Sequence, residues 1–156
     1  VGDTIKDLCL RIQTGASGTP ADKALSLYRQ ELMAKGIKVL AVAGGAWWCG
    51  PCMLEQPELV DLYDSYKASG GVGMLVVVSE KADRSVADDP SAQDWATSFK
   101  IPFEVGTDPV RALGPYFNTS SYPNSMVIKL DTMTITYFKV GRDAAALKAA
   151  IDAALK

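Results

Sequence analysis

Residues 47–52 read Trp-Trp-Cys-Gly-Pro-Cys and follow directly on an apolar run, Lys38–Ala43, and three small residues, Gly44-Gly45-Ala46. The apolar run predicts a buried strand, and the small residues predict a turn into a helix that begins near Cys49. Two residues between the cysteines bring both sulfurs within bonding reach when Cys52 lies in the first turn of that helix. The stretch therefore predicts a redox-active cysteine pair at a strand-to-helix junction.

The expected helix start favours a reactive sulfur. We expect Cys49 to be exposed at the helix tip, where unpaired backbone N–H groups and the helix dipole favour an anion. Such a position lowers a cysteine pKa from about 8.5 to between roughly 3.5 and 7.5, so Cys49 is the predicted nucleophile. Cys52, one turn further in, is the predicted resolving thiol. Pro51 fixes φ at the helix start without losing a hydrogen bond, and Gly50 leaves the approach to Cys49 open.

The rest of the chain predicts strands that alternate with helices, followed by a hairpin and a last helix. Strands are expected at Ile5–Gln13, Lys38–Ala43, Val72–Val78, Phe103–Val105, Ser125–Leu130 and Thr134–Val140. Helices are expected from Thr19-Pro20-Ala21-Asp22 to Gly36, from Cys49 to Tyr66 with a kink at Pro57, from Asp89-Pro90 past Phe99, from Asp108-Pro109 to Leu113, and over Ala144–Leu155. This order predicts a three-layer α/β protein with a mixed sheet.

Composition excludes several classes of function. The chain has 156 residues, 16 Lys+Arg against 18 Asp+Glu, a net charge of −2, three cysteines and no histidine. One domain is expected at this length. Without histidine there is no Ser-His-Asp triad, no Cys-His protease and no imidazole metal site, so we expect no metal. The charge balance favours neither nucleic acid nor an anionic membrane as partner. Uncharged apolar runs end after about ten residues, where a membrane span needs about twenty.

A family resemblance extends this interpretation. Trp48-Cys49-Gly50-Pro51-Cys52 is identical to the active-site run of thioredoxins, and the wider pattern resembles the TlpA/ResA-like thiol–disulfide oxidoreductases, a bacterial family usually exported and often membrane-tethered. Cys52-Met53-Leu54-Glu55-Gln56-Pro57 resembles the family's Cys-x-x-Glu-x-Pro, Ala43 stands where thioredoxins keep a buried Asp, and Tyr122-Pro123 resembles the cis-proline loop. The resemblance covers most of Lys38–Lys156.

The resemblance implies a fold and an activity. It implies a single thioredoxin-like domain over residues 1–156, an α/β/α sandwich whose core is 38–156 and whose N-terminal strand and helix extension is 1–37. The implied activity is thiol–disulfide exchange, with reduction of protein disulfides favoured over oxidation and no cofactor beyond the Cys49–Cys52 disulfide. Implied partners are disulfide-containing proteins and a dithiol electron donor, and a monomer is expected. An exported location, in the bacterial periplasm or cell envelope, is implied, with the cytoplasm left open; the chain starts at Val1, so a removed signal peptide or lipid anchor also stays open.

Site residues carried over by the resemblance lie at three further places. Pro123 is implied to be cis and to pack beside the cysteine pair, while the backbone of Tyr122 is presented to an extended substrate segment. The Tyr122 side chain is larger than is usual there and is expected to narrow the groove. Trp48 is expected to shield the disulfide and contact partners. Glu55 is the candidate to take the proton from Cys52, although on spacing alone it could equally be a solvated helix carboxylate.

Other interpretations remain open at this point. The cysteine pair could be half of a zinc site or an inert structural disulfide. A thiol peroxidase would want a Thr where Ala46 stands, and a copper-delivery protein of similar fold would want a histidine. A non-catalytic thioredoxin-fold binding module is the remaining class. Cys9 is predicted to be an inert buried thiol, and Trp47 and Trp95 are predicted to belong to the core.

Overall fold

A computed structural model describes residues 1–156 as seven strands and four helices. In chain order these are β1 (Cys9–Thr14), β2 (Ala21–Ala24), α1 (Leu25–Ala34), β3 (Val39–Ala46), α2 (Gly50–Tyr66), β4 (Val72–Glu80), α3 (Asp89–Ser98), β5 (Glu104–Thr107), β6 (Asn124–Lys129), β7 (Thr134–Val140) and α4 (Ala144–Ala154).

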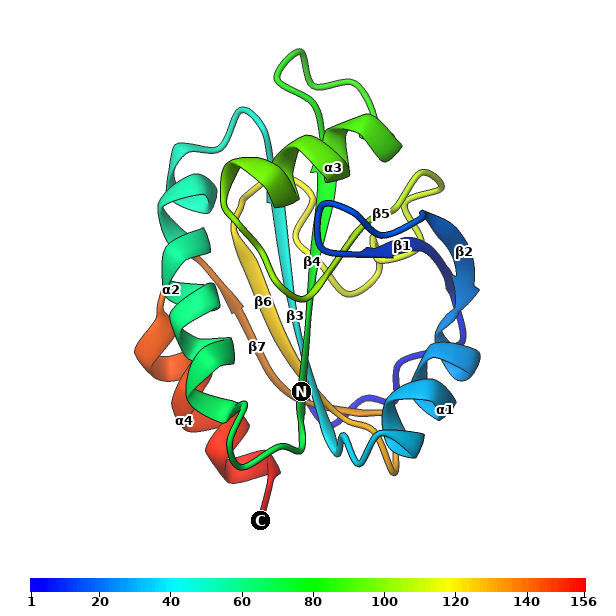
Figure 1. Ribbon diagram of the computed structural model, residues 1–156, viewed down its shortest axis with the longest axis vertical. Coiled ribbons are helices and arrows are strands. Elements are labelled where there is room, and N and C mark those ends of the chain that lie inside the picture. Colours follow the sequence, from blue (N-terminus) through cyan, green and yellow to red (C-terminus); the bar gives the residue numbers. More distant parts are fainter.

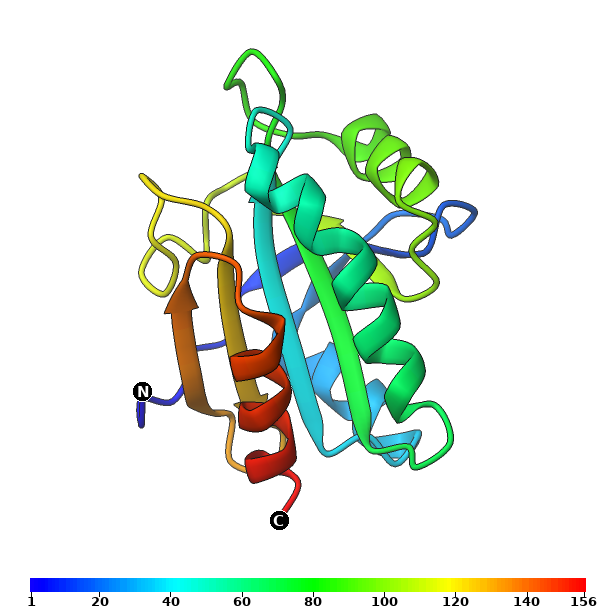
Figure 2. The ribbon, with the colours of Figure 1, turned by 90° about the vertical axis from the view of Figure 1, so that its left-hand side faces the viewer.

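All seven strands form one sheet in the order β2-β1-β5-β4-β3-β6-β7. Strands β3, β4 and β5 are parallel, whereas β1 pairs antiparallel with β5 and β6 pairs antiparallel with β3. Helices α2, α3 and α4 cover one face and α1 covers the other (Figures 1 and 2). The prediction of a three-layer α/β/α sandwich with a mixed sheet is therefore confirmed.

The two faces of the sheet are closed by two separate hydrophobic clusters. The larger cluster, of 24 buried residues, joins β3 and β4 to α2, α3 and α4. The smaller, of 16 buried residues, joins the other face to α1 and to the segment before β6. Every residue of Val39–Ala46 is buried, because a central parallel strand is covered on both faces. This explains why β3 is an unbroken run of apolar and small residues.

The predicted helix start at Thr19-Pro20-Ala21-Asp22 is wrong. Ala21–Ala24 forms β2, which pairs antiparallel with β1 in the register Ile12↔Ala21, and α1 begins at Leu25. The capping pattern is local, whereas pairing with β1 satisfies the backbone of this segment through a partner nine or more residues away. Tyr28 and Leu32 share the buried face of α1, as the periodicity predicts.

The predicted short helix from Asp108 to Leu113 is also absent, and the segment forms turns. The Asp108 carboxylate accepts hydrogen bonds from the backbone N–H groups of Ala112 and Leu113, at 2.7 and 2.8 Å. Arg111 has φ 55°, in the left-handed region, which interrupts any helix at that point. The acidic residue thus caps a turn where the sequence pattern predicts a helix.

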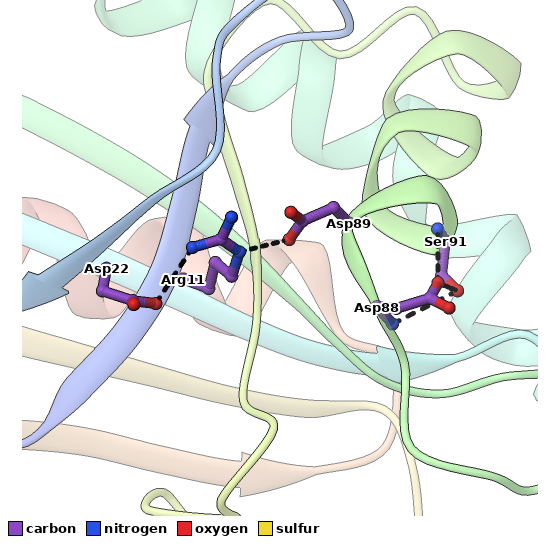
Figure 3. Close-up of polar contacts among 5 residues, drawn as sticks. All are labelled: Arg11, Asp22, Asp88, Asp89 and Ser91. Carbon is purple, nitrogen blue, oxygen red and sulfur yellow. Dashed lines mark hydrogen bonds and ion pairs between the residues drawn. The ribbon is translucent and has the colours of Figure 1, made fainter.

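A polar contact ties the N-terminal strands to α3 (Figure 3). The Arg11 guanidinium on β1 contacts Asp22 on β2 at 3.2 Å and Asp89 at the start of α3 at 2.6 Å. Asp88 caps α3 by accepting from the backbone N–H of Ser91 at 3.1 Å.

No helix of the structure is long and apolar enough to cross a bilayer.

Candidate active site

The cysteine pair lies where β3 passes into α2. Cys49 is the N-cap residue of α2, and its Sγ accepts a hydrogen bond from the backbone N–H of Cys52 at 3.1 Å. The two sulfurs form a disulfide of 2.00 Å. Pro51 occupies the first turn, where its missing N–H costs nothing, and Gly50 and Pro51 are exposed. The helix start therefore directs the backbone N–H of Cys52 at the sulfur of Cys49.

The expected exposure of Cys49 is wrong for this disulfide form. Cys49 keeps only 3% of its accessible surface and Cys52 keeps none. Both residues belong to the larger hydrophobic cluster, and Trp48 and Tyr122 pack against that cluster. The N-terminal position on α2 does not expose the sulfur, because Cys49 packs into this cluster.

Gly44 and Gly45 do not form the predicted turn, since β3 continues through them to Ala46. Their role is close packing. A Cβ on Gly45 would lie 3.2 Å from the Cβ of Cys52, and one on Gly44 would lie 2.5 Å from the ring of Phe117. Gly45 therefore lets Cys52 sit directly against β3.

An aromatic contact joins Trp48, the residue before Cys49, to the loop that precedes β6. The rings of Trp48 and Tyr122 meet edge to face with centroids 5.7 Å apart. The Tyr122–Pro123 peptide bond is cis, and Pro123 is buried immediately before β6. Because β6 pairs with β3 up to Asn124 opposite Gly44, Pro123 lies at the end of the sheet from which α2 starts.

Asn124 holds this loop, and sequence analysis missed it. Its side chain is fully buried; its amide donates to the carbonyls of Asn118 and Ser121, and its Oδ1 accepts from the Asn118 N–H, all at 3.0 Å. A polar residue directly after the proline, at the start of an apolar strand, is the signal that could have indicated it.

Glu80 is a second residue that the sequence did not indicate. It ends β4, and its carboxylate accepts from the Trp48 indole N–H at 2.7 Å and from Arg111 at 3.2 Å. The Glu80 side chain is only 10% exposed. It therefore fixes the orientation of Trp48, the residue before Cys49.

Glu55 is buried, which excludes the alternative of a solvated helix carboxylate. Its exposed fraction is 1%, and burial raises the pKa of Glu55 to about 7; Glu58 raises this pKa further and Arg142 opposes the rise. The neighbouring Gln56 donates from its side-chain amide to the Cys52 carbonyl at 2.8 Å. A carboxyl that titrates near neutrality, three residues after Cys52, is suited to proton transfer.

Of the remaining sequence-based predictions, the structure confirms one and contradicts another. Trp95 is fully buried and packs edge to face on Trp47 at 4.9 Å, so its core role is confirmed. The burial expected for Cys9 is wrong, because strand alternation turns Leu10 into the core and leaves Cys9 exposed on the opposite face. The structure contains no cluster of three or more Cys, Asp or Glu side chains that could hold a metal ion.

The chain has the thioredoxin fold, and the solved structures similar to it include proteins described as thiol:disulfide interchange proteins and as disulfide oxidoreductases. In sequence comparisons no protein-family model matches, and no curated protein matches significantly.

Three of the similar structures show the extent of the likeness. A Chlorobium tepidum protein provisionally described as thiol:disulfide interchange protein DsbE is 24% identical with a TM-score of 0.71, over 99% of this chain and 97% of that chain. The thioredoxin domain of a thiol-disulfide oxidoreductase from Bacteroides vulgatus is 13% identical with a TM-score of 0.70, over 99% and 97%. A secreted Mycobacterium tuberculosis disulfide oxidoreductase, homologous to E. coli DsbE, is 17% identical with a TM-score of 0.60, over 91% and 94%.

Proposed function

We propose that this protein is a thiol–disulfide oxidoreductase that reduces protein disulfides through Cys49 and Cys52. The observation that carries the proposal is the Cys49–Cys52 disulfide at the start of α2, with the Cys49 sulfur accepting the Cys52 N–H. In the reduced protein the same N–H and the helix dipole stabilise a thiolate at Cys49, which makes it a nucleophile near neutral pH.

The exchange has two steps. The Cys49 thiolate attacks one sulfur of a substrate disulfide, forms a mixed disulfide and releases the first substrate thiolate. The Cys52 thiolate then attacks Cys49, closes the Cys49–Cys52 disulfide and releases the second substrate thiolate. The substrate gains two electrons, and a partner dithiol protein returns two electrons to the pair. No cofactor takes part.

Glu55 is proposed to accept the proton of Cys52 before the second step. Its pKa of about 7 means that a useful fraction is ionised, and able to take a proton, at neutral pH. It lies three residues after Cys52 on α2, and both residues are buried on the core side of that helix. Once Cys52 has attacked, the disulfide carries no charge and Glu55 can release the proton to solvent.

Substrate binding is proposed at the surface around Trp48. An extended substrate segment would pair with the backbone of Tyr122 beside Pro123, with Gly50 and Pro51 on the other side of the disulfide. Since Cys49 is 3% exposed, substrate binding is proposed to displace side chains packed against its cluster, Trp48 and Tyr122 among them. We further propose an exported location, which the description of one similar structure as secreted supports.

The test is a trapping experiment with Cys52→Ala. Without the resolving thiol, the mixed disulfide through Cys49 should accumulate with natural substrates, and mass spectrometry of the adducts would identify them. Cys49→Ser is the matched control, and Cys9 is replaced by Ser in both variants because it is an exposed free cysteine. The control should then trap nothing, because its one remaining cysteine, Cys52, is fully buried. Absence of adducts from both variants, together with no reduction of insulin by the unmodified protein, would contradict the proposed function.

A further inference from the structure

Two arginines flank Trp48 at the edge of the candidate site. The guanidinium of Arg84 lies 4.1 Å from the centroid of the Trp48 ring, a cation–π contact. On the indole N–H side of Trp48, Glu80 accepts from the indole at 2.7 Å and from Arg111 at 3.2 Å. Trp48, the residue next to Cys49, therefore contacts Arg84 directly and is linked to Arg111 through Glu80.

The acidic groups on the two loops that carry Arg84 and Arg111 already have partners. Asp88 contacts Lys81, Asp83 accepts from the hydroxyl and N–H of Ser85, and Asp108 accepts two backbone N–H groups. Glu80 uses one oxygen for Trp48 and the other for Arg111. None of these carboxylates forms an ion pair with Arg84, the nearest cation to Trp48.

The guanidinium groups, by contrast, have spare donors. Arg84 is exposed and makes no ion pair or side-chain hydrogen bond, so all five of its N–H donors are free. Arg111 uses a single nitrogen, and its side chain is 53% exposed. A planar group with free N–H donors close to Trp48, the chain neighbour of Cys49, is suited to binding carboxylates, which accept two parallel hydrogen bonds from arginine.

We propose that Arg84 and Arg111 select substrates whose segment beside the reactive disulfide carries acidic side chains. This inference rests on the proposed function and names its substrate class: proteins with Asp or Glu next to the disulfide that Cys49 attacks. The carboxylates would bind the free guanidinium donors on the two sides of Trp48, and this would hold the substrate sulfur over Cys49. The overall net charge of −2 does not favour such substrates, so the selectivity would come from these two side chains.

The test compares disulfide peptides that differ only in flanking charge. The reduced protein is mixed in a stopped-flow instrument with two cyclic disulfide peptides, one flanked by Glu and one by Lys. Each rate is divided by the rate of the same peptide with dithiothreitol, which removes the intrinsic reactivity of the peptide. We expect a corrected preference of about five- to tenfold for the Glu peptide at low salt, decreasing as salt screens the charges.

Substitutions assign the preference to the two arginines. Arg84→Gln with Arg111→Gln should reduce the preference to about twofold or less, whereas the matched control Lys35→Gln should keep it, because Lys35 lies at the far end of α1. Equal corrected rates for the two peptides, or an unchanged preference in the double variant, would overturn the inference.

A second measurement separates this inference from the proposed function. In the disulfide form, a Glu peptide without cysteine should shift the NMR signals of the Arg84 and Arg111 side-chain N–H groups, and a Lys peptide should not. If neither disulfide peptide is reduced while these shifts occur, the proposed function fails and the acidic-peptide site stands. If both peptides are reduced at equal corrected rates, the function stands and the acidic selectivity fails.

Discussion

Glu55 is an ionisable carboxyl group in a buried environment, which disfavours its charged form. A carboxyl at 1% exposure would lose much of its hydration if ionised, so burial raises its pKa to about 7 from a usual 4.5. Arg142 relieves this only in part, because its guanidinium is engaged with Glu58 through two hydrogen bonds at 2.9 and 2.5 Å. A group held in this way reduces stability at neutral pH, which is consistent with a catalytic rather than a structural role.

Glu55→Gln should therefore change the pH dependence of stability. Between about pH 4.5 and pH 7 the folded protein holds a proton on Glu55 that the unfolded chain has lost, so this group makes the free energy of unfolding fall as the pH rises. Gln does not ionise, so its free energy of unfolding does not fall in this way. Between pH 4.5 and pH 8 the free energy of unfolding of the variant should exceed that of the unmodified protein by up to about 3 kcal/mol. Denaturant unfolding of the disulfide forms across this pH range measures the difference.

Asp61→Asn is the control, because Asp61 is exposed on the same helix. Its stability curve should run parallel to that of the unmodified protein. A Glu55→Gln curve that is also parallel would show that Glu55 is not held neutral by burial.

At the scale of elements, the fit between β3 and α2 places the cysteines. The Gly45 Cα faces Cys52 so closely that an added Cβ would lie 3.2 Å from the Cβ of Cys52 and 3.6 Å from the Trp95 ring. The helix start can approach the strand only because position 45 has no side chain. Gly44 and Gly45 therefore allow neighbouring side chains to approach β3 closely, and their own backbone continues the strand.

Gly45→Val tests this packing. Its branched side chain would push Cys52 and Trp95 outward, so we expect a loss of about 2 kcal/mol in the free energy of unfolding. Gly50→Ala is the matched control, because a Cβ there meets nothing within 4 Å, and its stability should change by less than about 0.5 kcal/mol. Equal losses in both variants would contradict the packing role of Gly45.

Most elements could be predicted from sequence, and two of the failures are false helix starts. The strand predicted at Val72–Val78 continues to Glu80 in the structure, the strand predicted at Thr134–Val140 has those bounds, and the cap at Asp143 marks the start of α4. The false helix starts lie at Ala21–Ala24 and near Asp108. Pairing with β1 makes the first segment a strand, and this partner leaves no local signal. At the second, the Asp108 carboxylate accepts backbone N–H groups within its own segment and caps a turn instead of a helix.

At the scale of the whole molecule, the site depends on segments far apart in the chain. The CGPC run identifies the cysteines, but the ring that contacts Trp48 comes from Tyr122, and the orientation of Trp48 comes from Glu80 at the end of β4. The sheet order makes β3 the neighbour of both β4 and β6, which is why these segments meet. Sequence spacing could not indicate Glu80, Arg84 or Arg111, since their contacts span 31 to 36 residues.

The N-terminal segment also belongs to this architecture. Six residues before position 38 join the smaller hydrophobic cluster, which closes the sheet face opposite α2: Ile5, Leu10, Ile12, Leu25, Tyr28 and Leu32. Helix α1 thus covers this face of β3 and β4, while β1 extends the sheet beside β5 (Figure 2). The whole sheet, and not the helix alone, holds the start of α2 in place.

The central claim is that the start of α2 stabilises a thiolate at Cys49. The most direct measurement is the pH titration of thiolate absorbance near 240 nm in a Cys9→Ser, Cys52→Ala variant, in which Cys49 is the single remaining cysteine. The account predicts a pKa below about 7.5 for Cys49, because the helix N–H groups and dipole favour the anion. A pKa near 8.5, the value of a free cysteine, would contradict it.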